Sequence, residues 1–126
     1  MKTAAELVKE AKQRVENLSV EQVAGEMAKG QVTLIDLRES PERQAGVIPG
    51  AIHAPRGMIE FYADPTSPSH RPELNRQSRV ILHCASGGRS ALAADTLQQM
   101  GYVNVAHLDG GFKAWQSAGM PVEQPK

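Results

Sequence analysis

Apolar side chains follow a helical period over the N-terminal part of the chain. Those of the first stretch are spaced one to four residues apart and are Leu7, Val8, Ala11, Val15 and Leu18. Polar and charged residues separate them, which predicts an amphipathic helix over residues 3–18. Ser19 and Gln22 then have the spacing of a capping box, so a second, short helix is expected to begin there and to end near Gly30.

Beyond Gly30 the pattern changes to short apolar runs that predict strands. These runs cover residues 32–37, 51–54, 79–83 and 103–108. Ser40 and Pro41 are typical of an N-cap and a first helical residue, and further helices are expected over residues 58–62, 90–100 and 111–118. The proline-rich residues 64–75 predict an irregular loop. Strands that alternate with helices favour a parallel sheet covered on both faces, an α/β sandwich.

The composition is that of one globular domain. The chain has 126 residues, a length that is enough to bury a core but too short for a separate catalytic domain. Hydrophobic residues make up 40% and charged residues 22% of the chain, as in globular proteins. The 14 basic and 14 acidic side chains cancel, so no nucleic-acid partner is expected. No apolar run is long enough to span a bilayer, and the N-terminal residues lack the apolar region of a secretory signal. A cytoplasmic protein without membrane association is therefore expected.

The segment most informative about chemistry runs from Cys84 to Ser90, between a predicted buried strand and the next helix. Cys84 is the only cysteine, which excludes an internal disulfide and Cys-rich metal sites and favours a reducing compartment. In open α/β sheets, ligands bind beyond the carboxyl ends of the strands, next to helix N-termini. Gly87 and Gly88 allow the backbone to bend, so the N–H groups of the loop are expected to converge on an anion.

These surroundings predict a reactive thiolate at Cys84. A helix N-terminus, converging amides and the fixed charge of Arg89 all favour the thiolate over the thiol, so the pKa of Cys84 is expected to be depressed. The alternative is that Cys84 is a small buried core residue, the commonest role of a free cysteine, and that Arg89 forms a surface ion pair. A core cysteine needs neither the Gly-Gly loop nor the arginine, so the reactive interpretation is favoured.

The loop and three other segments together resemble the rhodanese family of sulfurtransferases. The other segments are residues 34–38 (Leu-Ile-Asp-Leu-Arg), 46–52 (Gly-Val-Ile-Pro-Gly-Ala-Ile) and 108–115 (Leu-Asp-Gly-Gly-Phe-Lys-Ala-Trp). Their order and spacing match the family over residues 19–122, so an N-terminal helical extension, residues 1–18, and one rhodanese-like domain, residues 19–126, are expected. The resemblance implies a three-layer α/β/α sandwich with a five-stranded, mostly parallel sheet of order 1-5-4-2-3.

The resemblance also implies a reaction at Cys84. This residue would take a sulfane sulfur from a donor such as thiosulfate, become a persulfide, and pass the outer sulfur to a thiol, cyanide or protein acceptor. The donor would be bound by the loop residues, which are Ala85, Ser86, Gly87, Gly88 and Arg89. The covalent persulfide makes a metal or an organic cofactor unnecessary, and none is expected.

Two alternatives to a sulfurtransferase stay open. One is a low-turnover persulfide-carrying or regulatory module that docks a protein partner. The other is a phosphatase or arsenate reductase, since some phosphatases resemble rhodaneses. Those phosphatases place one more residue between their cysteine and arginine than the four that separate Cys84 from Arg89. The shorter loop presents a tighter cradle and favours sulfur over a phosphoryl group.

Other polar residues are candidates for supporting roles. Asp36 and Arg38 match the Asp-x-Arg pattern of the family and are expected to brace the structure, with Arg38 paired to Glu39 or Glu42. Arg56 either recognises the donor or acceptor near the mouth of the site or is a solvated charge. Ser90 ends the loop and is included among the supporting residues.

The histidines and the second glycine pair are interpreted structurally. The histidines are His53, His70, His83 and His107; they lack metal-ligand spacing and are expected to pack or to lie at the surface. His83 should point away from Cys84, to the opposite face of its strand. Gly110 and Gly111 predict a tight turn, and Trp115 is expected to pack on the core.

Overall fold

Five strands form a single sheet in the computed structural model, which describes residues 1–126. The strands are β1 (Glu16–Leu18), β2 (Thr33–Asp36), β3 (Ile52–His53), β4 (Val80–His83) and β5 (Val105–Leu108). Their order across the sheet is β1-β5-β4-β2-β3, and every neighbouring pair is parallel. The predicted fold class and strand order are confirmed, and the sheet expected to be mostly parallel is parallel throughout.

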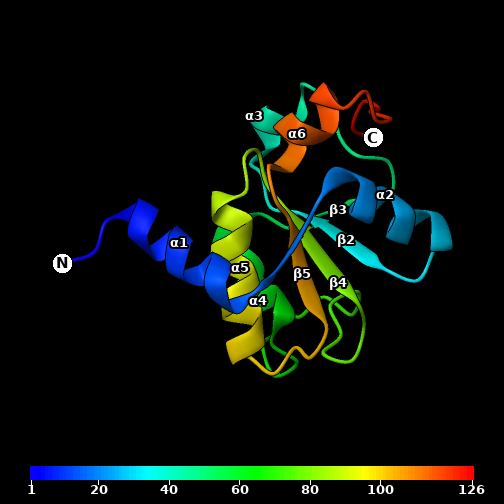
Figure 1. Cartoon of the computed structure of the whole chain (residues 1–126). Helices are drawn as coiled ribbons and strands as arrows, with labels where there is room; N and C mark the ends of the chain where they lie inside the picture. The colour runs from blue at the N-terminus through cyan, green and yellow to red at the C-terminus, as the bar shows by residue number, and fades with distance from the viewer.

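Helices cover both faces of this sheet (Figure 1). They are α1 (Ala4–Arg14), α2 (Val20–Lys29), α3 (Ser40–Arg43), the 3-10 helix η1 (Arg56–Met58), α4 (Ile59–Ala63), α5 (Gly88–Gln99) and α6 (Gly111–Ser117). Helices α1, α4 and α5 lie on one side, and α2 and α6 lie on the other. The proline-rich residues 64–75 contain neither helix nor strand, as predicted.

The helix predicted over residues 3–18 is wrong at its C-terminal end. Helix α1 stops at Arg14, Val15 is extended, and the following residues form the edge strand β1, which pairs with β5. Val15 and Leu18 therefore enter different cores on the two faces of the sheet, although their spacing also suits one helix face. Pairing with β5 satisfies backbone groups that a longer helix would have satisfied locally, so residues 16–18 belong to the sheet and not to a helical extension.

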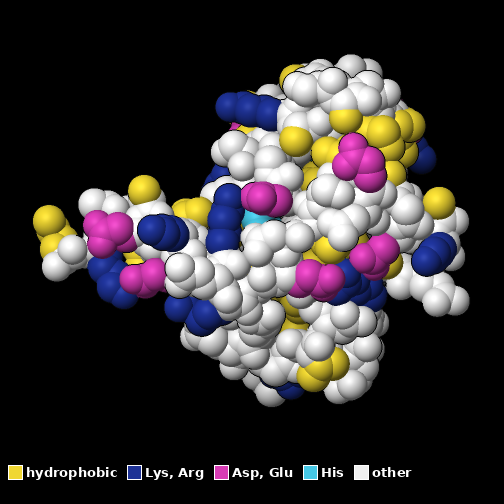
Figure 2. Space-filling model, in the orientation of Figure 1, with side chains coloured by type: hydrophobic (Ala, Val, Ile, Leu, Met, Phe, Trp, Pro, Cys, Tyr) yellow, Lys and Arg dark blue, Asp and Glu magenta, His cyan; other side chains and the backbone are white.

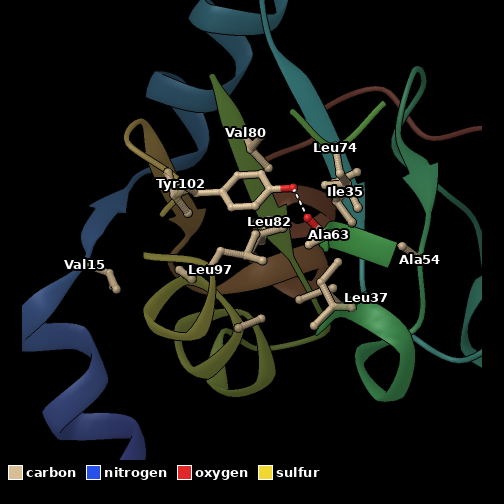
Figure 3. Packing of buried hydrophobic residues seen from close by; sticks show 14 of the residues in the cluster. Val15, Ile35, Leu37, Ala54, Ala63, Leu74, Val80, Leu82, Leu97 and Tyr102 are labelled. Carbon is tan, nitrogen blue, oxygen red and sulfur yellow. Dashed lines mark hydrogen bonds between the residues drawn. The ribbon is translucent and has the colours of Figure 1, made fainter. Parts of the chain in front are cut away.

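The two cores follow from alternation along the central strand β4. Val80 and Leu82 face the core beneath α4 and α5, whereas Ile81 faces the core beneath α2 and α6. On the first side, Leu97 of α5 lies next to Leu82, and the buried hydroxyl of Tyr102 donates to the carbonyl oxygen of Ala63 at 2.8 Å (Figure 3). This hydrogen bond joins the chain after α5 to the end of α4.

Helix N-termini agree with the predicted capping signals except at α3. Ser19 and Gln22 form the predicted capping box of α2. At α3, however, Glu39 and not Ser40 is the N-cap, because the carboxylate of Glu42 accepts the Glu39 backbone N–H at 2.8 Å. The cap thus lies one residue earlier than the sequence predicts.

The surface carries charges of both signs close together. Figure 2 shows basic and acidic side chains interspersed on the face that it draws, along the projecting part of α1 as well as over the body of the domain. Hydrophobic side chains gather on the same face near α2 and α6. None of the helices combines the length and the apolar character needed to cross a bilayer.

Candidate active site

Cys84 directly follows the central strand β4, at the carboxyl end of the sheet. Its side chain is only 1% exposed and faces the core beneath α5. His83 belongs to the opposite face, as predicted, and is also buried. The loop turns sharply at Gly87, whose φ of 105° is unfavourable for other residues, and α5 begins at the next residue. This turn brings the Gly87 N–H to 3.2 Å from Sγ of Cys84, so the backbone amide donates to the sulfur.

Two opposing effects set the acidity of this thiol. Burial raises the pKa of Cys84. A hydrogen bond from the Ser90 hydroxyl, whenever that hydroxyl donates to the sulfur, and those from the amides of Ser90, Gly87 and Ser86 lower it. The net pKa lies below the usual value of a cysteine, in the direction that the sequence predicts. The loop therefore supplies hydrogen bonds that can stabilise negative charge on the sulfur.

Helix α6 holds the back of this loop. The backbone N–H of Phe112 donates to the carbonyl oxygen of Cys84 at 2.8 Å, and that of Lys113 donates to the carbonyl oxygen of Ala85 at 3.0 Å. With these carbonyls bound to α6, the loop can turn amides toward the sulfur. The close approach requires Gly111, where a Cβ would lie 2.6 Å from the Ala85 carbonyl group. The Gly110-Gly111 pair thus forms the expected turn and also allows α6 to hold the loop that follows Cys84.

Arg89 is not free to bind an anion in this structure. The two terminal nitrogens of its guanidinium donate to the two carboxylate oxygens of Glu42 at 2.8 and 2.7 Å. The pKa of Glu42 is lowered to about 2, chiefly by these hydrogen bonds. The anion-binding role that the sequence favours for Arg89 would require this ion pair to open, so in the closed pair Arg89 braces the loop against α3.

Ser90 connects Cys84 to residues that sequence reasoning did not place in the site. Its Oγ lies 3.6 Å from Sγ of Cys84 and 2.9 Å from Nδ1 of His107, on the neighbouring strand β5. Nε2 of His107 lies 2.7 Å from Oδ1 of Asn17, on β1. His107 is fully buried, so its expected packing role is accompanied by a specific hydrogen-bond chain. The only signal in the sequence was a polar residue inside an otherwise apolar strand.

Asp36 and Arg38 form a buried ion pair at the end of β2. Nη2 of Arg38 lies 2.9 Å from Oδ2 of Asp36, and Arg38 also donates to the carbonyl oxygen of Gly46. The guanidinium stacks 4.1 Å from the ring centre of Phe112 in α6. The expected bracing role fits this geometry, but the carboxylate partner of Arg38 is Asp36 and neither Glu39 nor Glu42; of these two, only the Glu42 backbone carbonyl accepts from it.

The acid limb of the stability curve tests this ion pair. Burial raises the pKa of Asp36, but hydrogen bonds from Arg38 and the nearby charges of His83 and Arg38 outweigh it and lower the pKa to about 2. An unfolded aspartate titrates near pH ~3.9, so the pair stabilises the fold fully above that value and loses this contribution as pH falls through about 2. The difference in unfolding free energy between the parent and Asp36→Asn is expected to shrink by about 2 kcal/mol from pH ~5 to ~2, measured by chemical denaturation. A difference that does not change with pH would contradict the assignment, and Glu21→Gln at an exposed carboxylate is the control.

Arg56 lies in η1 and is already paired. Nη1 of its guanidinium lies 3.0 Å from Oε1 of Glu60, and no hydrogen bond or ion pair joins it to Cys84 or to the loop. His53 contacts the carbonyl oxygen of Arg38, and His70 contacts that of Leu74, as expected of packing residues. Hydrogen bonds and an ion pair therefore connect Cys84, its loop and Glu42, whereas the polar partner of Arg56 is Glu60.

Cys84 thus places a buried thiol, held by a backbone amide, directly after the central strand of a parallel α/β sheet. A sequence profile of the rhodanese-like domain matches residues 19–118, and the chain belongs to this family. It is 35% identical over 95 residues to a protein of Allochromatium vinosum named sulfurtransferase, with 75% of this chain and 81% of the relative aligned.

Two solved structures extend these comparisons. A Rhodopseudomonas palustris protein of unknown function, described as a possible tyrosine phosphatase, is 37% identical with a TM-score of 0.91, covering 98% of this chain and 96% of its own. The thiosulfate sulfurtransferase of Pseudomonas aeruginosa is 27% identical with a TM-score of 0.76, over 98% of this chain and 23% of its own. The sequence-based family resemblance is confirmed.

Proposed function

We propose that the protein is a sulfurtransferase that carries sulfane sulfur as a persulfide on Cys84. The observation that carries the proposal is the Gly87 N–H, 3.2 Å from Sγ, in a loop whose outer carbonyls are bound by α6. Family membership and the sulfurtransferase among the relatives support the same chemistry. Thiosulfate is the proposed test donor, and the solved thiosulfate sulfurtransferase of similar fold supports that choice.

The first half-reaction loads Cys84. Its thiolate attacks the outer sulfur of thiosulfate, the sulfur–sulfur bond of thiosulfate breaks, and sulfite leaves with the electron pair of that bond. A new bond then joins the transferred sulfur to Sγ, and the negative charge of the persulfide lies on the outer sulfur. Loop amides are suited to this step because they bind the negative charge of the donor and then that of the persulfide.

The second half-reaction returns the free cysteine. A nucleophilic acceptor, such as a thiolate, cyanide or a protein thiol, bonds to the outer sulfur while the bond to Sγ breaks and its electron pair stays on Cys84. The same amides then stabilise the departing thiolate. Because Cys84 is almost completely buried, the reacting group of donor and acceptor must be narrow enough to enter the loop.

Intact-protein mass spectrometry tests the loading step. The full chain is exposed briefly to thiosulfate, and a gain of one sulfur atom that maps to Cys84 and is removed by a thiol reductant is expected. No gain from thiosulfate or from a low-molecular-weight persulfide, with a thiol that still reacts with an alkylating agent, would overturn the proposal. Slow transfer to all small acceptors together with fast transfer to one protein would instead assign the low-turnover carrier role.

Releasing Arg89 is expected to strengthen binding of an anionic donor. In Glu42→Gln the amide can still cap α3, but Arg89 loses a charged partner and becomes available to thiosulfate. The KM for thiosulfate is expected to fall about two- to five-fold, the scale of a partly exposed ion pair. Steady-state assays of thiocyanate formation measure it, with Glu73→Gln, which removes the partner of Arg71, as the matched control. An unchanged or higher KM would exclude Arg89 from donor binding.

A phosphatase is the second candidate, because the Rhodopseudomonas palustris protein of similar structure is described as a possible tyrosine phosphatase. Two features disfavour it: four residues separate Cys84 from Arg89, and Glu42 neutralises the only arginine of the loop. Hydrolysis of an aryl phosphate that is lost in Cys84→Ser, with no thiosulfate-dependent sulfur gain, would select this candidate.

A further inference from the structure

His107 is a buried group that the proposed sulfur chemistry does not use, yet it lies in a chain of contacts that ends at the thiol. The chain runs from Cys84 through the hydroxyl of Ser90 to Nδ1 of His107, and from Nε2 of His107 to Asn17. Cys84, Ser90 and His107 are each at most 1% exposed. Helix α5 and strands β1 and β5 contribute Ser90, Asn17 and His107 to this chain of contacts. Asn17 lies outside the segment matched by the family profile.

Asn17 determines which nitrogen of His107 carries the proton. Both hydrogens of the Asn17 amide are used, because Nδ2 donates to the carbonyl oxygens of Lys12 at 2.9 Å and Val15 at 3.1 Å. Its Oδ1 therefore faces His107, and an oxygen there only accepts, so Nε2 of His107 must be protonated. Burial lowers the pKa of His107 to about 4, which keeps the ring neutral at physiological pH. A neutral imidazole has a single N–H, so Nδ1 is an acceptor.

This tautomer directs the hydroxyl of Ser90 away from the sulfur. The hydroxyl has one proton, and its nearest acceptor is Nδ1 of His107 at 2.9 Å, compared with 3.3 Å to the carbonyl oxygen of Gly87 and 3.6 Å to Sγ of Cys84. When the hydroxyl of Ser90 donates its hydrogen bond to His107, the lone pairs of its oxygen face Cys84. They suit an S–H donor or a neutral sulfur but not a negative one. Turning the hydroxyl toward a thiolate would leave Nδ1 buried without a partner, which is costly.

We propose that His107, held in one tautomer by Asn17, competes with Cys84 for the proton of Ser90 and so favours a neutral Sγ. Sγ is neutral in the thiol and also in the loaded persulfide, whose charge lies on the outer sulfur. It becomes negative only when an acceptor removes that sulfur and leaves the electron pair on Cys84. His107 is thus a positioning residue that slows discharge and prolongs the loaded state. The part of this inference that concerns the persulfide rests on the proposed sulfurtransferase function.

The charged and titratable groups around His107 and Cys84 are the same in the parent and in the variants at Ser90, His107 and Asn17. Lys12 of α1 and Asp109 after β5 face His107 and pair with each other at 2.8 Å. Arg89 of α5 acts on Cys84 and is paired with Glu42 of α3. His83 contacts the carbonyl oxygen of Cys84 from the other face of β4. None of these groups is changed by substitution at Ser90, His107 or Asn17.

The thiol pKa is the direct measurement, obtained from the rate of iodoacetamide alkylation of the single cysteine as a function of pH. In His107→Phe, the hydroxyl of Ser90 loses its nearest acceptor. A thiolate is a stronger acceptor than the carbonyl oxygen of Gly87, so the hydroxyl can then donate to sulfur, and the pKa of Cys84 is expected to fall by about 0.5 to 1 unit. Asn17→Ala, at an exposed position that spares the core, should shift it in the same direction by less. His70→Gln is the control. A rise in the pKa in His107→Phe and Asn17→Ala would overturn the proposal and make His107 a support of the thiolate.

A double-mutant cycle shows whether His107 acts through Ser90. In a Ser90→Ala background, His107→Phe is expected to leave the pKa of Cys84 unchanged, whereas an equal shift with and without Ser90 would overturn the mechanism.

Single-turnover discharge of the thiosulfate-loaded protein by cyanide should be about three- to ten-fold faster in His107→Phe, because a better stabilised thiolate leaves faster. An equal or slower discharge would overturn the role in discharge. If no persulfide forms in the parent, the proposed function fails, while the pKa measurements still test the competition for the Ser90 proton.

Discussion

Replacement of Cys84 by serine is expected to abolish sulfur transfer. The hydroxyl oxygen of serine cannot form the sulfur–sulfur bond of the intermediate, and Cys84 is the only cysteine of the chain. Thiosulfate-dependent thiocyanate formation should fall by at least about a thousandfold, and the mass gain should disappear. Serine is close in size to cysteine, so the variant should keep its fold, which circular dichroism and thermal unfolding will check.

A second variant, Cys84→Ala, tests whether Cys84 is the residue that carries the sulfur. Cys84→Ala removes the nucleophile without introducing a hydroxyl, and both variants should be equally inactive. Turnover of thiosulfate at the parental rate by a folded Cys84→Ala protein would show that the sulfur is not carried by this residue. In that event the persulfide mechanism would be wrong, whatever the family of the protein.

Gly111→Ala is expected to have the largest structural effect. The added Cβ would lie 2.6 Å from the backbone of Ala85 and 2.7 Å from the carbonyl oxygen of Cys84, at a φ of 63° that also disfavours alanine. The backbone conformation and the overlap together should lower the unfolding free energy by about 3 to 5 kcal/mol. Activity should be lost as well, since α6 would move away from the loop that it holds.

Gly119→Ala is the matched control for that substitution. Gly119 follows α6, has a similar φ of 73°, and a Cβ there would meet no atom within 4 Å. It therefore reports the cost of the left-handed backbone alone, about 1 to 2 kcal/mol, and sulfur transfer should be preserved. Denaturant unfolding and thiocyanate assays on both variants measure the contrast. Equal losses of stability would show that contact with the loop is unimportant.

Some of the features that these experiments test could be predicted from the sequence, and others could not. The apolar runs of β2, β4 and β5, the capping box of α2 and the glycine-rich segment after Cys84 are local patterns, and each was assigned correctly from neighbouring residues. Their alternation, with the family resemblance, was also enough for the parallel sheet and the strand order. Cys84 stands out for the same reason, because its predicted strand, turn and helix are contiguous.

Contacts between residues that come together only after folding could not be predicted from local patterns. Asn17, His107 and Ser90 are far apart in the sequence, and their contacts exist because β1, β5 and α5 lie side by side. Likewise, whether Arg89 binds an anion or pairs with Glu42 depends on where α3 lies. Local periodicity could not distinguish strand β1 from a continued helix, since Val15 and Leu18 suit both.

The sequence by itself determined the class of fold, the position of the thiol and the glycines that allow its loop to bend. Only the tertiary structure decided which charges are neutralised, which carbonyls α6 binds and which hydrogen-bond acceptors surround the hydroxyl of Ser90. The physical reason is that burial patterns and turn preferences depend on neighbouring residues. Hydrogen-bond and ion-pair partners depend on distances of a few ångströms between segments that the fold brings together.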